Sequence, residues 1–263
     1  MMTIRKALLY FIVCWGIFYL TATGISLLHY SYGLHLKIFS GYIFPVIAYG
    51  IIRLFIINKI PVELHLHHPI KIPLLSLLSI IVIALGLQIF NQSFVDIYYS
   101  LFYPESLDYF YSIQPQLTTD FWISFWPSFL ISPFLEEWLF RGFFFKNLLS
   151  KYDFATAAIV SSLFFSVVHL PYYGKLLPSL VLGVLLCYIF YKTQNIGLAF
   201  ALHALNNALA IFSDFVILNY WRPIVEQHFN WTYWSVISVG LIMVLMGLEL
   251  FRKSIKEKPR ENL

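Results

Sequence analysis

The sequence predicts an all-α integral membrane protein, a polytopic bundle of about eight transmembrane helices. Of its 263 residues, 60% are hydrophobic and only 11% are charged, whereas about a quarter of the residues of a soluble domain are charged. Apolar stretches long enough to cross a hydrocarbon core about 30 Å thick recur along the chain. The basic residues gather at the ends of these stretches, which is typical of membrane topology.

Eight apolar stretches are candidate spans, each close to the roughly 20 residues that a spanning helix needs. They cover residues 7–28, 38–57, 73–91, 121–149, 154–170, 176–191, 196–218 and 233–251. With both termini in the cytoplasm, the basic loops lie inside, and residues 91–120, which contain acids but no Lys or Arg, form an external loop. We expect this aromatic loop to lie along the membrane surface. The whole chain, 1–263, is expected to be a single membrane domain.

The net charge of +4 does not indicate a nucleic-acid partner. The basic residues lie at segment ends and in the C-terminal tail, where they suit anionic lipid headgroups. Cys14 and Cys187 lie within apolar runs and are expected to be buried thiols without a disulfide. Pro127 and Pro133 are expected to bend the fourth span.

The fourth span contains Glu136, Glu137 and Arg141. Charges at bilayer depth cost about 2.5–3.5 kcal/mol each, so they indicate a function. Glu137 and Arg141 are four residues apart and can form an ion pair on one helix face. Glu136 is turned about 100° away, which leaves it as the working carboxylate for general-base chemistry. The alternative is that the acids serve packing or an ion pathway.

Two later spans each contain one histidine, His169 and His203. Histidine is the natural partner for activating water near neutral pH. Asn207 is four residues after His203, so the two side chains project together and can act as two donors to an oxyanion. Span counting places His169 near the outer end of its helix and His203 nearer the inner end of its own. The alternatives are an interfacial His169 and a simple interhelical hydrogen bond from His203 and Asn207.

A metal site is a second possibility for the same residues. Glu136, His169 and His203 form a two-histidine, one-carboxylate set that suits zinc or another divalent ion. The sequence has no HExxH motif, and Asn207 suits oxyanion binding better than ligation, so we favour a metal-independent mechanism without a cofactor. The stretch from Glu63 to His68 contains three more histidines, but its spacing gives no helical ligand pair.

Three motifs resemble the signatures of the CPBP family, which includes type II CAAX prenyl endopeptidases and bacterial Abi-type bacteriocin-processing and immunity proteins. They are Glu136-Glu137-x-x-x-Arg141, Phe165-x-x-x-His169 and His203-x-x-x-Asn207. The resemblance covers residues 120–220, and the first 120 residues contribute only topology. It implies an eight-helix bundle around a polar cavity, in which Glu136 and His169 activate water while His203 and Asn207 stabilise the oxyanion.

The resemblance therefore implies an intramembrane endopeptidase, in a bacterial cell membrane, that acts on a hydrophobic or lipidated peptide. CAAX-type proteins and leader, bacteriocin or pheromone peptides are the expected substrates. One alternative is a proton-coupled transporter with a relay through Glu136, His169 and Asp214, although the sequence lacks paired broken repeats. Another is a non-catalytic scaffold or a bacteriocin self-immunity protein.

Overall fold

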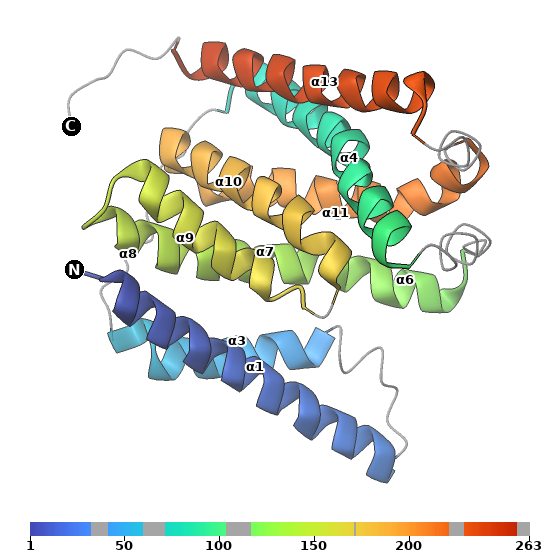
Figure 1. The fold of residues 1–263 in the computed structure, drawn as a ribbon. Coiled ribbons are helices and arrows are strands. Elements are labelled where there is room, and N and C mark those ends of the chain that lie inside the picture. Colours follow the sequence, from blue (N-terminus) through green and yellow to red (C-terminus); the bar gives the residue numbers. More distant parts are fainter. Residues whose placement is uncertain (33–41, 60–71, 104–116, 171, 221–228, 257–263) are drawn as a thin grey trace.

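A computed structural model gives the fold (Figure 1) and describes residues 1–32, 42–59, 72–103, 117–170, 172–220 and 229–256. All regular elements in these ranges are helices, which confirms the predicted all-α class. In chain order they are α1 (Ile4–Tyr32), α3 (Phe44–Phe55), η2 (Ile57–Lys59), α4 (Leu74–Phe102), α6 (Thr119–Trp126), η3 (Pro127–Ile131), α7 (Ser132–Glu137), η4 (Trp138–Phe145), α8 (Lys146–Leu149), α9 (Phe154–Val167), η5 (Tyr173–Lys175), α10 (Leu176–Thr193), α11 (Ile196–Tyr220) and α13 (Trp231–Lys256).

Four helical segments are long and apolar enough to cross a membrane, which supports an integral membrane protein. Within the described ranges they are Ile4–Leu27, Leu74–Phe102, Tyr173–Thr193 and Trp231–Ile255. Shorter apolar helices, Phe44–Phe55, Phe154–Val167 and Ile196–Phe212, lie between them. Each predicted span overlaps a helical segment, but the count of eight spans and the orientation of the termini remain predictions.

The predicted external loop at 91–120 is wrong in its first part, because α4 continues as a helix to Phe102. Its acid at position 96 is buried and hydrogen-bonded instead of exposed. One carboxylate oxygen of Asp96 accepts from Gln92 Nε2 at 2.9 Å, and the other accepts from the Tyr233 hydroxyl of α13 at 3.2 Å. A paired carboxylate can lie between two helices at a much smaller cost than an isolated one.

Helices α4 and α13 pack closely along one edge of the molecule (Figure 1). Glycines make this approach possible: a Cβ atom on Gly86 would lie 2.7 Å from the carbonyl oxygen of Gly240. A buried hydrogen bond between the Ser76 and Ser254 hydroxyls, 2.8 Å long, joins the same two helices. These helices form the side of the bundle farthest from α1 and α3.

The fourth apolar stretch is interrupted where its prolines predicted a bend. It contains two π-helical segments, η3 and η4, on either side of the short helix α7 that carries the acids. The N–H of Ser132 reaches the carbonyl of Pro127, five residues earlier, and the N–H of Lys146 likewise reaches that of Arg141. Such wide turns are rare and occur often at functional sites.

Helices α1 and α3 form a layer at the opposite edge from α4 and α13 (Figure 1). The first third of α1 contacts the central helices. Phe11 stacks on Phe164 of α9 with 4.5 Å between ring centroids, and the Ile4 N–H donates to the Tyr152 hydroxyl at 3.2 Å. Helix α9 begins at an exposed N-cap, Asp153, whose carboxylate accepts from the Thr156 N–H at 2.8 Å. Hydrogen bonding to Thr156 holds the pKa of Asp153 below its ordinary value.

Candidate active site

A buried carboxylate, Glu137, lies at the centre of the polar cluster. Its Oε1 accepts a hydrogen bond from Arg141 Nη1 at 2.8 Å, so the ion pair predicted from the i, i+4 spacing is present. The same oxygen lies 2.7 Å from His203 Nδ1 on α11. Sequence reasoning missed this second contact, because no spacing along one helix shows which distant helix packs against it. Glu137 therefore joins two of the three motifs.

Arg141 is fully buried and has two further partners. Its Nη2 donates to the carbonyl of Gly183 on α10 at 3.2 Å, and its guanidinium lies 4.5 Å from the centroid of the Phe165 ring. Gly183 allows α10 to approach α9 closely, since a Cβ there would lie 2.9 Å from Ser162 Cβ. Arg141 thus ties η4 to α7 by an ion pair, to α10 by a hydrogen bond and to α9 by a cation–π contact.

The Phe165 ring separates and orients the two histidines. Its centroid lies 5.1 Å from that of His169 and 5.3 Å from that of His203, both edge-to-face. The different depths suggested by span counting are therefore wrong: the structure brings both histidines to one place. Span counting assumes that each helix crosses the whole membrane core, about 30 Å thick. Helix α9 has only 14 residues and rises about 21 Å, so its end does not reach the far side of the core.

The hydrogen bonds of both histidines fix their tautomers. His169 Nδ1 lies 2.9 Å from the Phe165 carbonyl oxygen, and His203 Nδ1 lies 2.7 Å from Glu137 Oε1. Both oxygens only accept, so each Nδ1 must carry a hydrogen. The Nε2 atom of each ring is left for chemistry: neutral, it accepts a hydrogen bond, and as imidazolium it donates one.

Glu136 is turned away from Glu137, as the helical geometry predicted, and its side chain remains 30% exposed. It faces a cavity instead of the protein core. Its Oε2 lies 3.8 Å from His203 Nε2, which is too long for a direct hydrogen bond. A polar separation of this size is suited to bridging by a water molecule. His203 therefore has one carboxylate at each side of its ring.

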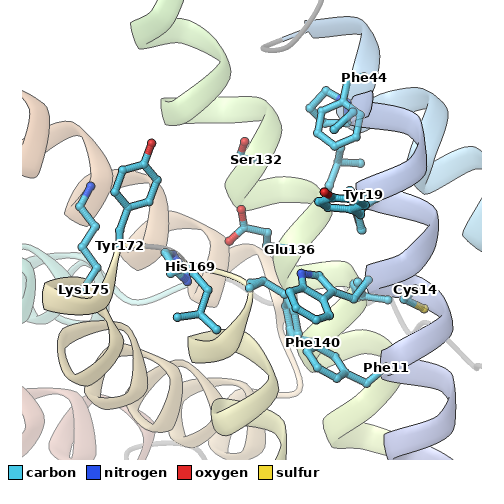
Figure 2. A pocket seen from close by; sticks show the side chains of 18 of the residues that line it. Phe11, Cys14, Tyr19, Phe44, Ser132, Glu136, Phe140, His169, Tyr172 and Lys175 are labelled. Atoms are coloured by element: carbon cyan, nitrogen blue, oxygen red, sulfur yellow. The ribbon is translucent and has the colours of Figure 1, made fainter. Parts of the chain in front are cut away.

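The cavity has a volume of about 630 Å³, and Glu136 and His169 both line it (Figure 2). Side chains of α1 and α3 form one wall, and side chains of η3, α7 and η4 form the rest together with Val168, His169, Leu170, Tyr172 and Lys175. The α1 wall is mainly apolar: Phe11, Cys14, Trp15, Phe18, Tyr19 and Ala22. The first 120 residues, for which the sequence predicts only topology, therefore also supply a wall of this cavity. Their apolar pattern predicts a helix but carries no signal for a cavity wall.

Asn207 lies beside the π-helical segment η3. Its Nδ2 donates to the carbonyl of Ser128 at 3.0 Å, which uses one of the two N–H groups of the amide. Ser128 also lines the cavity, so this bond brings α11 to the cavity edge. The oxyanion role of His203 and Asn207 remains a prediction. Asp214 lies outside the residues whose side chains the structure describes.

The alternative metal set does not match the described geometry. Among the residues that the structure describes, no three His, Cys, Asp or Glu side chains lie close enough together to hold a metal ion. Glu136, His169 and His203 are thus near one another without forming a ligand cluster. The histidines between Glu63 and His68 lie outside the described residues. Cys14 and Cys187 are both free and buried, as predicted.

The comparisons with known proteins point to one family. Residues 118–209 match the family described as type II CAAX prenyl endopeptidase Rce1-like. No curated protein and no solved structure matches the chain. The matched segment contains all three motifs, from Glu136 to Asn207, and agrees with the CAAX-protease resemblance seen in the sequence. Residues 118–209 are therefore similar to the Rce1-like type II CAAX prenyl endopeptidases, a similarity that covers about a third of the chain.

Proposed function

We propose that the protein is an intramembrane endopeptidase that hydrolyses a peptide bond in a hydrophobic or lipidated peptide, with Glu136 as the general base. One observation carries the proposal: the partly buried carboxylate of Glu136 and the imidazole of His169 line one cavity within an apolar helical protein. The family match over residues 118–209 supports a protease. The mainly apolar wall from α1 suits a substrate that arrives from the membrane.

The reaction needs a water molecule between Glu136 and His169. Glu136 takes one proton from this water as the water oxygen attacks the peptide carbonyl carbon. His169 Nε2 accepts a hydrogen bond from the second O–H, which stays on the attacking oxygen, and so orients the water. The tetrahedral intermediate then collapses, the C–N bond breaks, and Glu136 returns its proton to the leaving amine. The products are a carboxylic acid and an amine, which become a carboxylate and an ammonium ion when the acid's proton passes to the amine, and no covalent enzyme intermediate forms.

The negative charge on the former carbonyl oxygen needs hydrogen-bond donors. We assign them to His203 Nε2, as imidazolium, and to the Asn207 N–H that does not bind Ser128. Glu137 positions His203 by accepting from Nδ1 at 2.7 Å, and Arg141 in turn holds Glu137 at 2.8 Å. Glu137 and Arg141 are therefore positioning residues, and neither lines the cavity.

The proposal is tested by comparing Glu136→Gln with the wild-type protein on quenched fluorescent membrane peptides. General-base catalysis contributes about 100- to 10,000-fold, so turnover should fall by at least about 100-fold while the protein remains folded. Glu249→Gln is the matched control, because Glu249 is a glutamate on the exposed side of α13, paired with Arg252. Its turnover should equal that of the wild type.

A chelator arm separates the two mechanisms. Under the metal-independent mechanism, turnover by the wild type survives the chelator. Loss with chelator and recovery with zinc would instead assign Glu136, His169 and His203 to a metal. Equal turnover by wild type and Glu136→Gln would contradict the proposal altogether and would favour a scaffold or transport function for the cavity.

A further inference from the structure

We propose that Lys175 binds the free C-terminal carboxylate of the peptide substrate and so sets the direction in which the peptide lies in the cavity. This inference rests on the proposed function and adds a recognition element to it. Lys175 is the one Lys or Arg among the described residues that line the cavity. Figure 2 shows Lys175 and Tyr172 on one side of the cavity and the α1 side chains on the other, with Glu136 between them.

The backbone that carries Lys175 is fixed relative to His169. The Tyr172 N–H donates to the His169 carbonyl at 2.9 Å, and the Lys175 N–H donates to the Tyr172 carbonyl at 2.9 Å. The Ser166 hydroxyl donates to the Leu176 carbonyl at 2.6 Å, which ties the end of α9 to the start of α10. Two consecutive turns and one cross-link therefore hold Lys175 at a set place beside the histidine.

A packing contact with α4 holds the same segment from behind. Gly174, next to Lys175, is buried, and a Cβ at this position would lie 3.2 Å from the ring of Tyr98 on α4. Lys175 itself is exposed and is one of the residues that line the cavity. A fixed backbone with a free-standing ammonium group is suited to binding, because little conformational entropy beyond that of the lysine side chain is lost.

The charges around the cavity favour an anion at Lys175 and disfavour one elsewhere. No carboxylate of the described residues lies within ion-pair distance of the Lys175 ammonium, whose nearest aromatic contact is the Tyr172 ring at 5.5 Å. Among the described residues, Glu136 is the one carboxylate that lines the cavity, and it repels a second negative charge. A peptide with a free carboxylate therefore places its C-terminal end at Lys175. The residues before that end then pass next to Glu136.

The opposite wall makes the orientation unambiguous. Phe11, Phe18 and Phe44 present apolar surface and no charge to the cavity. A terminal carboxylate there would lose its hydration without gaining a partner. The apolar or lipidated part of the substrate takes this side, and the charged end takes the side of Lys175.

The test is a binding measurement on the Glu136→Gln background, so that it does not depend on turnover. A fluorescent membrane peptide is titrated in two forms, one with a free C-terminal carboxylate and one amidated, in neutral phosphatidylcholine nanodiscs. With Lys175 present, amidation should weaken binding about tenfold, the size expected for a hydrogen-bonded charge pair. With Lys175→Gln added, the two peptides should bind within about twofold of each other.

The matched control is Lys192→Gln. Lys192 also stands over tyrosine rings, those of Tyr188 and Tyr191 at 5.9 and 5.8 Å, but does not line the cavity. It should retain the tenfold preference for the free carboxylate. If Lys192→Gln loses the preference for the free carboxylate as Lys175→Gln does, the preference reflects the general positive charge of the protein, and the assignment to Lys175 is overturned.

Two further outcomes would overturn it. If amidation weakens binding equally with and without Lys175, the carboxylate binds elsewhere. If the preference is unaffected but phosphatidylglycerol in the nanodisc competes with peptide only when Lys175 is present, the lysine binds a lipid phosphate instead. Absence of cleavage by the wild type contradicts the proposed function, while the binding ratio still decides the role of Lys175.

Discussion

At the scale of single residues, we expect Arg141 to be the residue of the buried polar cluster whose substitution lowers the stability of the protein most. Arg141→Met leaves Glu137 buried with His203 as its remaining described partner. Breaking a buried ion pair from one side costs about 3–5 kcal/mol, so we expect a large fall in membrane yield and in the thermal unfolding midpoint in detergent. The double variant Glu137→Gln/Arg141→Met should recover part of this loss, since it leaves no buried carboxylate unpaired.

The control for this prediction is another arginine–glutamate pair on one helix. Arg252 contacts Glu249 through two bonds of 2.7 Å, but its side chain is 48% exposed. Water and salt screen such a pair, so Arg252→Met should change the unfolding midpoint little. Equal losses in Arg141→Met and Arg252→Met would contradict the view that burial makes the first pair essential.

At the scale of helices, close packing of α4 on α13 depends on glycine. A Cβ on Gly86 would meet the Gly240 carbonyl oxygen at 2.7 Å and the Val244 backbone nitrogen at 2.8 Å. Backbone atoms cannot rotate away, so Gly86→Ala should separate the helices and cost about 1–3 kcal/mol of stability. Gly50→Ala in α3 is the control, because a Cβ there meets nothing within 4 Å. Thermal unfolding in detergent should show a loss in the first variant and none in the second.

The helices also show what periodicity and composition predict well. Long apolar runs predict the helical segments, but an acid at position 96 indicates an external loop when the sequence is considered alone. The structure extends α4 through it to Phe102, because Tyr233, more than 130 residues later, supplies a hydrogen bond. A buried hydrogen bond between two helices that are far apart in the sequence cannot be predicted from the local sequence of either helix. Boundaries that depend on such pairs are therefore the part of the fold that sequence patterns miss.

At the scale of the whole molecule, the same limit applies to the site. Spacing along one helix predicted the Glu137–Arg141 pair, and it is present. Contacts between helices, such as His203 with Glu137, and the α1 wall of the cavity needed the packed structure. The i, i+4 spacing relates side chains within one helix, whereas side chains from several helices line the cavity. The roles proposed for Glu136, His169, His203 and Asn207 rest on both kinds of information.

The arrangement of α1 over the cavity leads to a prediction for the intact protein. Phe11 stacks on Phe164 at 4.5 Å, and Cys14, one turn later, is buried and lines the cavity. Phe11→Ala removes the stacking contact and should let α1 move away from the cavity, so that maleimide labels Cys14 several-fold faster. Mass spectrometry distinguishes Cys14 from the fully buried Cys187.

Leu20→Ala is the control, because Leu20 lies on α1 with its side chain largely exposed. It should label at the wild-type rate, since the substitution removes no packing against the central helices. A membrane-permeant maleimide is needed, because Cys14 lies within a candidate span. Equal labelling rates in Phe11→Ala and Leu20→Ala would mean that contacts other than Phe11 hold this wall. In that case the Phe11–Phe164 stacking is not what shields Cys14.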